Sequence, residues 1–548
     1  MATKIPAEPQ HYPKVGDVFA DTLKRNAVPY LFGIPGGGSA IDLIESCKSV
    51  DIPFVLVQHE TTAAMAAAVT GELTGTCGVC VSIMGPGAAN LASGASYSLW
   101  ERHAVISLTE AYPFAQASQM SLQLMDHSRM FTSFSKASEV LDVADPSGQL
   151  VRLMTLAQRE RPGPVHLDLP NELLNTEFTG LNDAKQESPV KKPVVGDLDA
   201  MVSEIDRSVK PVLVIGPAVV RSGASHTIVE LAEKLQVAVL VTSKARGVIP
   251  ETHPLFAGVL TGVYHPATFE GKIISASDLV VAVGLDRMEL LSPWKYRQPV
   301  VAIDAIDTSH EQVGTPLHTV HGPLDELLAL IIETVKPKQA WNSEELSYFW
   351  NTAIRALQGN QSELNAATLL VKARDMAPED TVLVTETGIY NAVNLFTWKV
   401  PSPDLYFGSS GANTMGFALP AAIASSLIRP FQKTIVLVGD GGFLMKASEL
   451  ETLARLKLTP TIIVFNDGTL GLIRVKQEAK GYQRDSVDLS SVDIVSLARS
   501  FGGRGEQVHS LKAFVSAFAR SLQSDTFTVI DARLDPGVYA SHMDPVRG

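Results

Sequence analysis

Apolar residues in this chain gather in short runs that alternate with longer segments of mixed polarity. The runs "KTIVLVG" (433–439) and "PTIIVF" (460–465) are rich in β-branched residues and have the length of buried strands. The segment 445–458 between them carries apolar residues at helical spacing, at Leu450, Leu453, Ala454 and Leu456. The pattern predicts a strand, a helix and a second strand, joined by a right-handed crossover that makes the two strands parallel.

The same alternation of strand and helix patterns recurs in three blocks of the chain. Polar segments that contain proline and lysine separate the blocks near 181–197 and 335–345. Strand runs in the first and third blocks end in glycine-rich or acidic turns, as in parallel sheets whose loops gather at one edge. We therefore predict an α/β fold of three doubly wound parallel-sheet domains, at residues 1–182, 195–335 and 350–548.

Glycines and oxygen-bearing side chains follow the two strands of the motif at 433–467. The sequence "GDGG" (439–442) comes after one strand, and "ND" (466–467) comes after the other. Because neighbouring parallel strands end at the same edge of a sheet, these groups should meet there. Glycines let the backbone approach a phosphate, and carboxylate and carbonyl oxygens suit Mg²⁺ better than zinc. The motif predicts a site for a diphosphate and Mg²⁺.

Composition narrows the range of partners. The chain has 548 residues, of which 45% are hydrophobic, and a formal net charge of -13 at pH 7. The acidic balance and the lack of a basic run argue against binding to nucleic acid. The N-terminal segment has neither an apolar signal core nor an arginine-rich amphipathic pattern, and no apolar stretch is long enough to span a bilayer. We expect a cytoplasmic protein that does not bind membranes.

Three cysteines are too few for a disulfide framework. Cys77 and Cys80 form a C-x-x-C, but the motif runs into the strand-like "VCVSIM" and has no second ligand pair nearby. We interpret both as small residues of a buried strand rather than as a redox or zinc site.

The middle block has the strand pattern of a dinucleotide-binding domain without its fingerprint. Gly216 and Gly223 in "GPAVVRSG" do not form G-x-G-x-x-G, and the next strand ends in "VTSKARG" without the expected acidic residue. A Rossmann-like scaffold without a nucleotide is favoured. An oxidoreductase that uses FAD or a nicotinamide on this domain stays an alternative, and FAD binding is left open.

The segment 439–467 resembles the thiamine diphosphate signature, which begins with Gly-Asp-Gly and ends at an amide or carboxylate. Further motifs stand in the order found in acetolactate synthase-like members of the thiamine diphosphate-dependent 2-oxo acid decarboxylase/carboligase superfamily: "GIPGGGSAIDLIE", "VQHETTAAMAAAVTGELTG", "IMGPGAANLASGA" and "SSGANTMGFALPAAIAS". The resemblance covers nearly the whole chain. It implies that the three blocks are a pyrimidine-binding, a central and a diphosphate-binding domain.

The resemblance also implies the ligands of the cofactor and its metal. Asp440 would bind Mg²⁺ through its carboxylate and Thr469 through its main-chain carbonyl, with Asp467 as the second side chain and Asn466 as the alternative. Other cofactor contacts would be Pro35, Gly36, Asn90, Gly388, Met415, Gly439, Gly441, Gly442, Leu470 and Gly471.

Two residues would act on the cofactor rings. Glu60 resembles the glutamate that protonates the pyrimidine ring, which requires a carboxylate that reaches the ring nitrogen in a site with little water. Without the resemblance, Glu60 is explained as a negative charge that stabilises the N-terminus of a helix. Met415 matches the bulky apolar residue that props the cofactor in its bent conformation. A lone methionine is otherwise a core residue.

The family decarboxylates 2-oxo acids, and its branches differ in the fate of the resulting enamine. No His-His pair occurs in the first block, and "SIM" precedes "GPGAAN" where one branch carries a histidine. Few groups are thus left to protonate the enamine, which favours its ligation to a second carbonyl. A non-oxidative decarboxylase that releases an aldehyde is the alternative, and a catalytically silent regulatory homologue is a further one.

The substrate stays open, because the chain departs from acetolactate synthases at two places. "LTEAYPF" replaces their Gly-Gln-Val-Pro turn, and Lys476 replaces a tryptophan of the second-substrate pocket. The resemblance also implies a homodimer or homotetramer with active sites between subunits, because Glu60 of one chain would meet the diphosphate loop of another.

Overall fold

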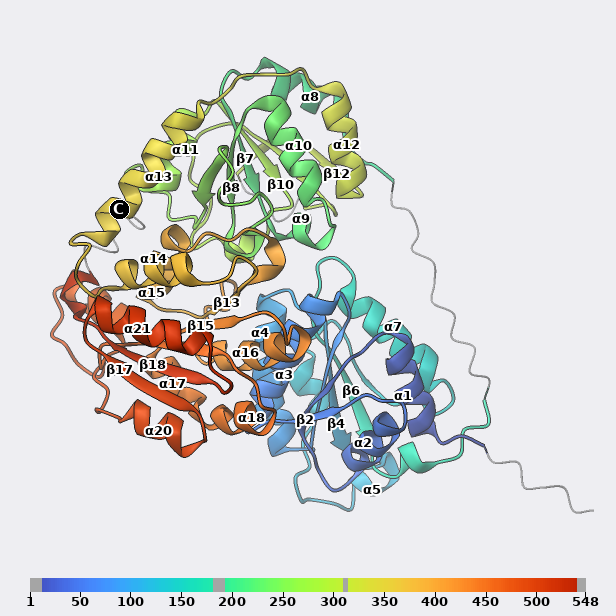
Figure 1. Cartoon of the computed structure of the whole chain (residues 1–548). Helices are drawn as coiled ribbons and strands as arrows, with labels where there is room; N and C mark the ends of the chain where they lie inside the picture. The colour runs from blue at the N-terminus through green and yellow to red at the C-terminus, as the bar shows by residue number, and fades with distance from the viewer. Residues whose placement is uncertain (1–11, 181–192, 309–313, 540–548) are drawn as a thin grey trace, which may run out of the picture. The chain divides into compact units, whose positions relative to one another are not determined.

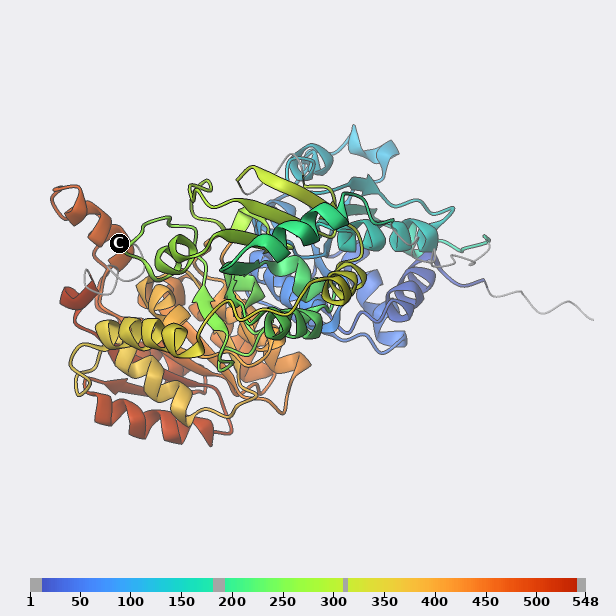
Figure 2. The same cartoon turned by 90° about the horizontal axis from the view of Figure 1, so that it is seen from above.

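The computed structural model describes residues 12–180, 193–308 and 314–539. The chain divides into two compact units, Met1–Ser188 and Pro189–Gly548. Three six-stranded sheets, all with parallel pairing, form the cores of the fold, one in the first unit and two in the second (Figures 1 and 2). The predicted α/β class with three parallel sheets is confirmed. The predicted domain boundaries stay a prediction, because the second unit contains two sheets that share one hydrophobic core.

The sheet of the first unit has the strand order β2-β1-β3-β4-β6-β5. Its strands are β1 (Leu31–Ile34), β2 (Phe54–Leu56), β3 (Gly78–Ser82), β4 (Val105–Ala111), β5 (Ser138–Val140) and β6 (Val165–Pro170). The helices of the unit are α1 (Val15–Arg25), α2 (Ser39–Ser49), α3 (Glu60–Thr74), α4 (Pro86–Trp100), α5 (Phe114–Ala117), α6 (His127–Phe131), α7 (Pro146–Gln158) and the 3₁₀ turn η1 (Leu173–Asn175).

The first sheet of the second unit has the order β12-β11-β10-β7-β8-β9, which is the order of a Rossmann fold. Its strands are β7 (Pro211–Ile215), β8 (Ala238–Val241), β9 (Phe256–Val259), β10 (Leu279–Val283), β11 (Val300–Asp304) and β12 (Pro316–His321). Its helices are α8 (Leu198–Arg207), α9 (Pro217–Arg221), α10 (Ser225–Leu235), α11 (Phe269–Ala276) and α12 (Leu324–Thr334), with 3₁₀ turns η2 (Ser243–Ala245) and η3 (Arg287–Glu289).

The other sheet of the second unit has the order β14-β13-β15-β16-β18-β17. Its strands are β13 (Val382–Thr385), β14 (Tyr406–Gly408), β15 (Thr434–Gly439), β16 (Thr461–Asn466), β17 (Arg504–Val508) and β18 (Thr528–Arg533). The helices are α13 (Ser343–Gln358), α14 (Ala366–Met376), α15 (Ile389–Thr397), α16 (Ala418–Ile428), α17 (Asp440–Met445), α18 (Leu450–Arg455), α19 (Gly471–Ala479), α20 (Ile494–Ser500) and α21 (Leu511–Leu522). The 3₁₀ turns are η4 (Pro403–Leu405), η5 (Ala447–Glu449) and η6 (Pro536–Val538).

The sheet of the first unit and this last sheet share one topology, although their sequences show no repeat. In both, the second strand lies outside the first, and the third strand lies on the first strand's other side. The direction of winding therefore reverses between the first and third strands. Ligands of open parallel sheets bind at such a switch point, outside the carboxyl ends of the strands. The loops after β1 and β3, and those after β13 and β15, are the places where this topology positions a site.

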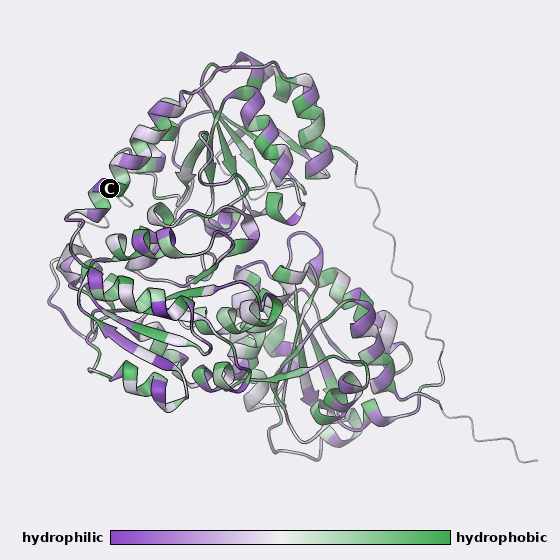
Figure 3. Ribbon diagram, in the orientation of Figure 1, coloured by the Kyte–Doolittle hydropathy of each residue, from purple (hydrophilic) through white to green (hydrophobic). Residues whose placement is uncertain are grey.

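Burial follows the hydrophobic pattern along the chain. In Figure 3 the strands are mainly hydrophobic, while many helices carry hydrophilic residues on one side. All residues of β3 are buried, and burial raises the pKa of the Cys77 and Cys80 thiols, so both cysteines are core residues as expected. No described helix is long and apolar enough to cross a membrane.

The strand, helix and strand predicted at 433–467 are present, but the helix is not continuous. β15 and β16 pair in parallel, with Gly439 beside Phe465. The segment between them is divided into α17, η5 and α18, with a non-helical backbone at Lys446. The break turns the chain so that Glu449 is buried, where its carboxylate accepts a hydrogen bond from Thr452 Oγ1 at 2.8 Å. The spacing of apolar residues in the sequence does not reveal such a break in the helix.

Candidate active site

A cavity of about 450 Å³ lies at the carboxyl ends of β13, β15 and β16. Its lining includes most residues that the sequence assigns to the cofactor in the third block: Gly388, Met415, Gly439, Asp440, Gly441, Gly442, Asp467, Thr469, Leu470 and Gly471. The topology explains the grouping, because β13 and β15 are the strands of the switch point. Residues far apart in the sequence thus share one cavity.

Two carboxylates lie close together at this cavity. Asp440 is 6% exposed, and its Oδ1 and Oδ2 accept hydrogen bonds from Gly441 N and Gly468 N, each at 2.8 Å. Burial, and then the negative charge of Asp467, raise the pKa of Asp440 from 3.8 to about 6. A buried carboxylate beside a second one is costly unless a cation joins them. The pair therefore has the chemistry of a site for a hard divalent cation.

The two candidates for the second side-chain ligand point to different partners. Asn466, the last residue of β16, is buried, and its Nδ2 donates to Asp531 Oδ1 at 2.8 Å. Asp467 lines the cavity, and its Oδ1 accepts hydrogen bonds from Thr469 N at 2.8 Å and Thr469 Oγ1 at 2.9 Å. The arrangement favours Asp467 over Asn466, in line with the first choice from the sequence.

Glu386 is a buried residue of this site that the sequence motifs do not reveal. It follows β13, is 1% exposed, and its Oε2 accepts a hydrogen bond from Ala418 N at 2.9 Å. Burial raises the pKa of Glu386 to about 7, although hydrogen bonds from backbone amides at the start of α16 oppose the shift. Glu386 therefore ties the end of β13 to the segment that carries Met415.

The same carboxyl group explains why residue 442 is glycine. A Cβ atom at Gly442 would lie 1.7 Å from Glu386 Oε1, far inside contact distance. From the sequence, Gly442 is explained by the close approach of a diphosphate to the backbone. The structure adds a second reason, because the Glu386 carboxyl group occupies the space that a side chain at residue 442 would need.

Tyr390 is a second residue that sequence analysis missed. Its hydroxyl accepts a hydrogen bond from Gly439 N at 3.1 Å and donates to Thr387 O at 3.2 Å, so it joins the loops after β15 and β13. Its ring stacks on Phe465 at 4.5 Å and would lie 2.2 Å from a Cβ atom at Gly388. Tyr390 thus shapes the cavity wall beside two of the predicted glycines. An aromatic residue two positions after the glycine that precedes α15 was the available signal.

Glu60 lies in the first unit, as the first residue of α3. It is 7% exposed, and its Oε2 accepts a hydrogen bond from Asn90 Nδ2 of α4 at 3.0 Å. A Cβ atom at Gly87 would lie 3.2 Å from its other oxygen. Two residues that the sequence assigns to the cofactor, Glu60 and Asn90, are therefore in direct contact.

The loop after β1 holds the remaining two predicted residues. Pro35 is exposed, and Gly36 is buried against Glu110, since a Cβ atom at Gly36 would lie 2.2 Å from Glu110 Oε2. Glu110 Oε1 accepts hydrogen bonds from Gly38 N at 2.9 Å and Ala40 N at 3.0 Å, and burial raises its pKa. Glu110 belongs to "LTEAYPF", the segment at which the sequence departs from the acetolactate synthase pattern. A buried carboxylate from that segment therefore holds the loop after β1.

These features fit a diphosphate cofactor with its metal. The paired carboxylates of Asp440 and Asp467 suit the cation, the backbone of the "GDGG" turn is open to the cavity, and Met415 and Leu470 supply apolar wall for rings. A Cβ atom at Gly441 would lie 3.1 Å from both of these apolar side chains, so the turn is closely packed against them.

Comparisons with known proteins agree with this geometry. Models of the N-terminal thiamine pyrophosphate (TPP) binding domain, the central domain and the C-terminal TPP binding domain of thiamine pyrophosphate enzymes match residues 13–130, 198–329 and 386–532.

Relatives along the whole length point the same way. A probable acetolactate synthase large subunit of Methanocaldococcus jannaschii is 28% identical over 95% of this chain and 92% of its own. The acetolactate synthase of Bacillus subtilis is 26% identical over 95% of this chain and 93% of its own. The thiamine diphosphate-dependent 4-hydroxybenzoylformate decarboxylase of Rhodococcus jostii has the same fold, with a TM-score of 0.83 at 22% identity over 96% of this chain and 100% of its own. The chain belongs to the acetolactate synthase-like superfamily of thiamine pyrophosphate-dependent enzymes.

Proposed function

We propose that this enzyme uses thiamine diphosphate and Mg²⁺ to decarboxylate a 2-oxo acid and to join the remaining acyl unit to a second carbonyl compound. The observation that carries the proposal is the pair Asp440 and Asp467 at the edge of a cavity whose wall includes Met415. Relatives named as acetolactate synthases support the ligation step.

Each of the predicted site residues would have a separate role in binding or orienting the cofactor. Asp440 and Asp467, with the main-chain carbonyl of Thr469, would hold Mg²⁺ and through it the diphosphate. Met415 would keep the two rings of the cofactor bent toward each other. Glu60 would hold a proton at the pyrimidine nitrogen. When bound, the cofactor supplies the carbanion chemistry, and the protein orients it and excludes water.

Ligation is favoured over release of an aldehyde because the cavity offers few proton donors. Among the described residues that line it, none is a histidine. In the first unit, His127 is buried with both ring nitrogens in hydrogen bonds, so it has no free position from which to deliver a proton. An acyl unit that is protonated slowly persists long enough to meet a second carbonyl.

Lys476 would help to select that second carbonyl compound. It lies on α19, lines the cavity and is exposed. An ammonium group at this place favours an acceptor that carries a carboxylate, such as a second 2-oxo acid.

We also propose a two-fold homodimer, or a homotetramer built from such dimers, with active sites between subunits. An apolar segment beside the turn that precedes α4 supports association. Its exposed residues are Phe114, Met120, Leu122, Leu124 and Met125. The segment contacts this turn directly, because a Cβ atom at Gly85 would lie 2.5 Å from Gln123 O.

The test is product analysis with a panel of 2-oxo acids, each supplied alone and with excess aldehyde or a second 2-oxo acid. We expect hydroxyketone or acetohydroxy acid to be the main product, and its yield to depend on thiamine diphosphate and Mg²⁺. If free aldehyde is the sole product at every acceptor concentration, the enzyme is a decarboxylase instead. A visible absorption spectrum of the same protein shows whether FAD is bound.

A further inference from the structure

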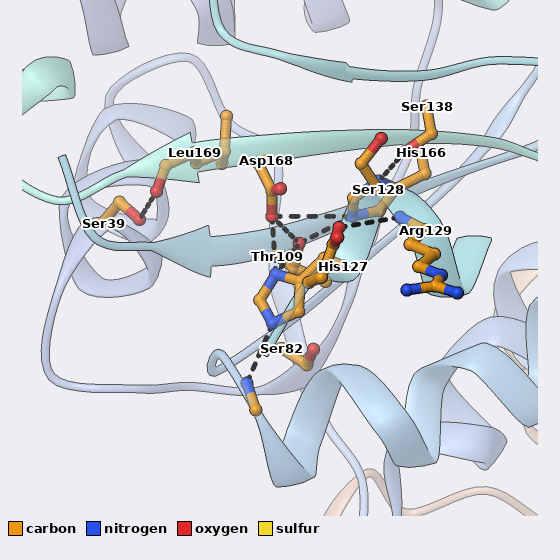
Figure 4. A network of polar contacts seen from close by, with 12 residues as sticks. Ser39, Ser82, Thr109, His127, Ser128, Arg129, Ser138, His166, Asp168 and Leu169 are labelled. Atoms are coloured by element: carbon orange, nitrogen blue, oxygen red, sulfur yellow. Dashed lines mark hydrogen bonds and ion pairs between the residues drawn. The ribbon is translucent and has the colours of Figure 1, made fainter. Parts of the chain in front are cut away.

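A buried polar network lies below the carboxyl edge of the sheet in the first unit (Figure 4). Asp168 of β6 accepts a hydrogen bond through Oδ1 from Thr109 Oγ1 at 2.6 Å and lies 2.7 Å from His127 Nδ1. Thr109 Oγ1 is 2.7 Å from His166 Nε2, and His166 Nδ1 is 2.8 Å from Ser138 Oγ. Thr109, His127, His166 and Asp168 are each at most 7% exposed. None of them belongs to the motifs that identify the family.

The far end of the network is a backbone amide. Gly85 N donates to His127 Nε2 at 3.0 Å, in a buried position. An amide N–H can only donate, so His127 Nε2 must be unprotonated, and the ring proton must sit on Nδ1, where it is donated to Asp168. The hydrogen bonds therefore admit one tautomer of His127 and exclude its doubly protonated form.

The other histidine fits the same assignment. Thr109 donates its only proton to Asp168, so it must accept from His166 Nε2–H. Burial lowers the pKa of His166 to about 4 against the opposing charge of Asp168, so the ring is neutral and its unprotonated Nδ1, 2.8 Å from Ser138 Oγ, accepts from that hydroxyl. The ring of His166 also stacks on Phe131 at 3.9 Å. Each hydrogen-bonding proton of the network is thereby assigned to one donor atom.

The Gly85 amide connects this network to Glu60. Gly85 precedes α4 and has φ +65°, and as a glycine it has no side chain of its own to cap the helix. One turn later, Asn90 donates to the Glu60 carboxylate at 3.0 Å, and Gly87 lies against its other oxygen. Thr61 Oγ1 in turn donates to Asn90 O at 2.9 Å. The position of the first turn of α4 thus sets where the Glu60 carboxylate lies.

We propose that His127 is a positioning residue for Glu60, which it controls through the Gly85 amide and the start of α4. Asp168 fixes the tautomer of His127, and the unprotonated Nε2 holds Gly85 N and with it the turn that carries Gly87 and Asn90. The proposal rests on the function proposed for Glu60. It assigns to the buried histidine a role in orientation, with no proton transfer to substrate.

The same side chains could be taken for a metal site, since ligand atoms of His127, His166 and Asp168 lie within 4.8 Å of one another. The hydrogen bonds argue otherwise. The Thr109 hydroxyl lies between Asp168 and His166, within 2.7 Å of both, and the Nδ1 of His127 is already engaged with Asp168. A cation would displace bonds that are complete without it.

The first test examines the protein without cofactor. Long-range ¹⁵N NMR of histidine-labelled protein, assigned with His127→Gln and His166→Gln variants, should show His127 protonated at Nδ1 and unprotonated at Nε2. It should show the opposite tautomer for His166. Protonation of His127 at Nε2, or stoichiometric zinc that is lost in the His166→Gln variant, would overturn the proposal.

The second test compares three variants of the holoenzyme. His127→Leu removes the acceptor of the Gly85 amide, whereas His127→Gln keeps an oxygen that can reach the position of Nε2. Ser138→Ala removes only the outermost hydrogen bond of the network and is the matched control. The readouts are the exchange rate of the C2 proton of bound cofactor with deuterium, which reports on Glu60, together with cofactor affinity and melting temperature.

We expect exchange to slow at least tenfold in His127→Leu, to return to within about threefold of wild type in His127→Gln, and to be unchanged in Ser138→Ala. Equal rates in all variants, or equal losses in both His127 variants, would overturn the proposal. Glu60→Gln separates the two claims. If exchange is normal in Glu60→Gln, the function proposed for Glu60 fails as well. If exchange is slow there but normal in His127→Leu, only the positioning role fails.

Discussion

Replacement of Gly442 by alanine tests the contact between the "GDGG" turn and Glu386. Gly442 lies in α17, where alanine is normally preferred over glycine by about 1 kcal/mol. Here the new Cβ atom would lie 1.7 Å from Glu386 Oε1, so either the carboxyl group or the turn must move. Helix propensity and packing therefore predict effects of opposite sign.

The size of the effect follows from what holds Glu386. The side chain is buried, and its Oε2 accepts from Ala418 N at 2.9 Å, so rotation away from the added methyl group would leave a buried carboxyl without this bond. Loss of a hydrogen bond to a buried charged group costs about 1.5 to 3 kcal/mol. We expect Gly442→Ala to lower the melting temperature by several degrees.

Gly439→Ala is the control, since its Cβ atom would meet only Tyr390 Cε1, at an ordinary 3.5 Å, and its φ of -77° suits alanine. Differential scanning calorimetry of the protein without cofactor measures both variants. The double variant Glu386→Ala with Gly442→Ala should be no less stable than Glu386→Ala alone, because the obstruction is gone. Equal melting temperatures for Gly442→Ala and Gly439→Ala would refute the reasoning.

Three further predictions follow from the site. Because folding raises the pKa of Glu386 from 4.5 to about 7, the folded protein binds its proton more tightly, so this group's contribution to stability falls as the pH rises from about 4.5 to about 7. At about 1.4 kcal/mol for each of about 2.5 pH units the fall is about 3 to 4 kcal/mol, so calorimetry should show Glu386→Gln gaining stability over wild type across this interval, and parallel curves would disprove it. Inactive Glu60→Gln and Asp440→Ala proteins should regain activity when mixed after dissociation, and no recovery despite proven subunit exchange would contradict sites shared between subunits. Lys476→Gln should raise the KM of a carboxylate-bearing acceptor by up to about fivefold without changing that of a neutral aldehyde, and an equal change for both would exclude a charge-based role.

The pattern of the sequence was sufficient to predict the parallel sheets and the place where β15 and β16 end. Alternating apolar runs report burial of strands directly, and strands that pair in parallel bring their loops to one edge. The resemblance to the thiamine diphosphate-dependent family then identified Glu60, Asp440 and Met415 as candidate site residues. The discontinuity between α17 and α18 was not predictable, because Leu450 and Leu453, which carry the helical spacing, both lie in α18 and do not report on the break at Lys446.

The residues that hold the site in place could not be identified from the sequence. Glu386, Glu110 and His127 are buried polar groups whose partners are backbone amides far along the chain, such as Gly85 N for His127. A sequence shows that such a residue follows a strand or begins a helix, but not which amide it meets. In each case the partner amide belongs to a turn that contains glycine. A buried carboxylate or histidine beside such a turn therefore identifies this kind of contact in a structure.

The central claim is that Asp440 and Asp467 hold the cation that binds the diphosphate. Isothermal titration calorimetry of thiamine diphosphate into the protein without cofactor tests it most directly, with Mg²⁺ present or removed by chelator. We expect one cofactor per chain, binding that requires the divalent cation, and an affinity at least about 100-fold lower in Asp440→Ala, since loss even of groups behind a metal ligand can cost that much. Asn466→Ala serves as the comparison and should weaken binding much less than Asp467→Ala. Equal affinity with and without Mg²⁺, and in wild type and Asp440→Ala, would contradict the account.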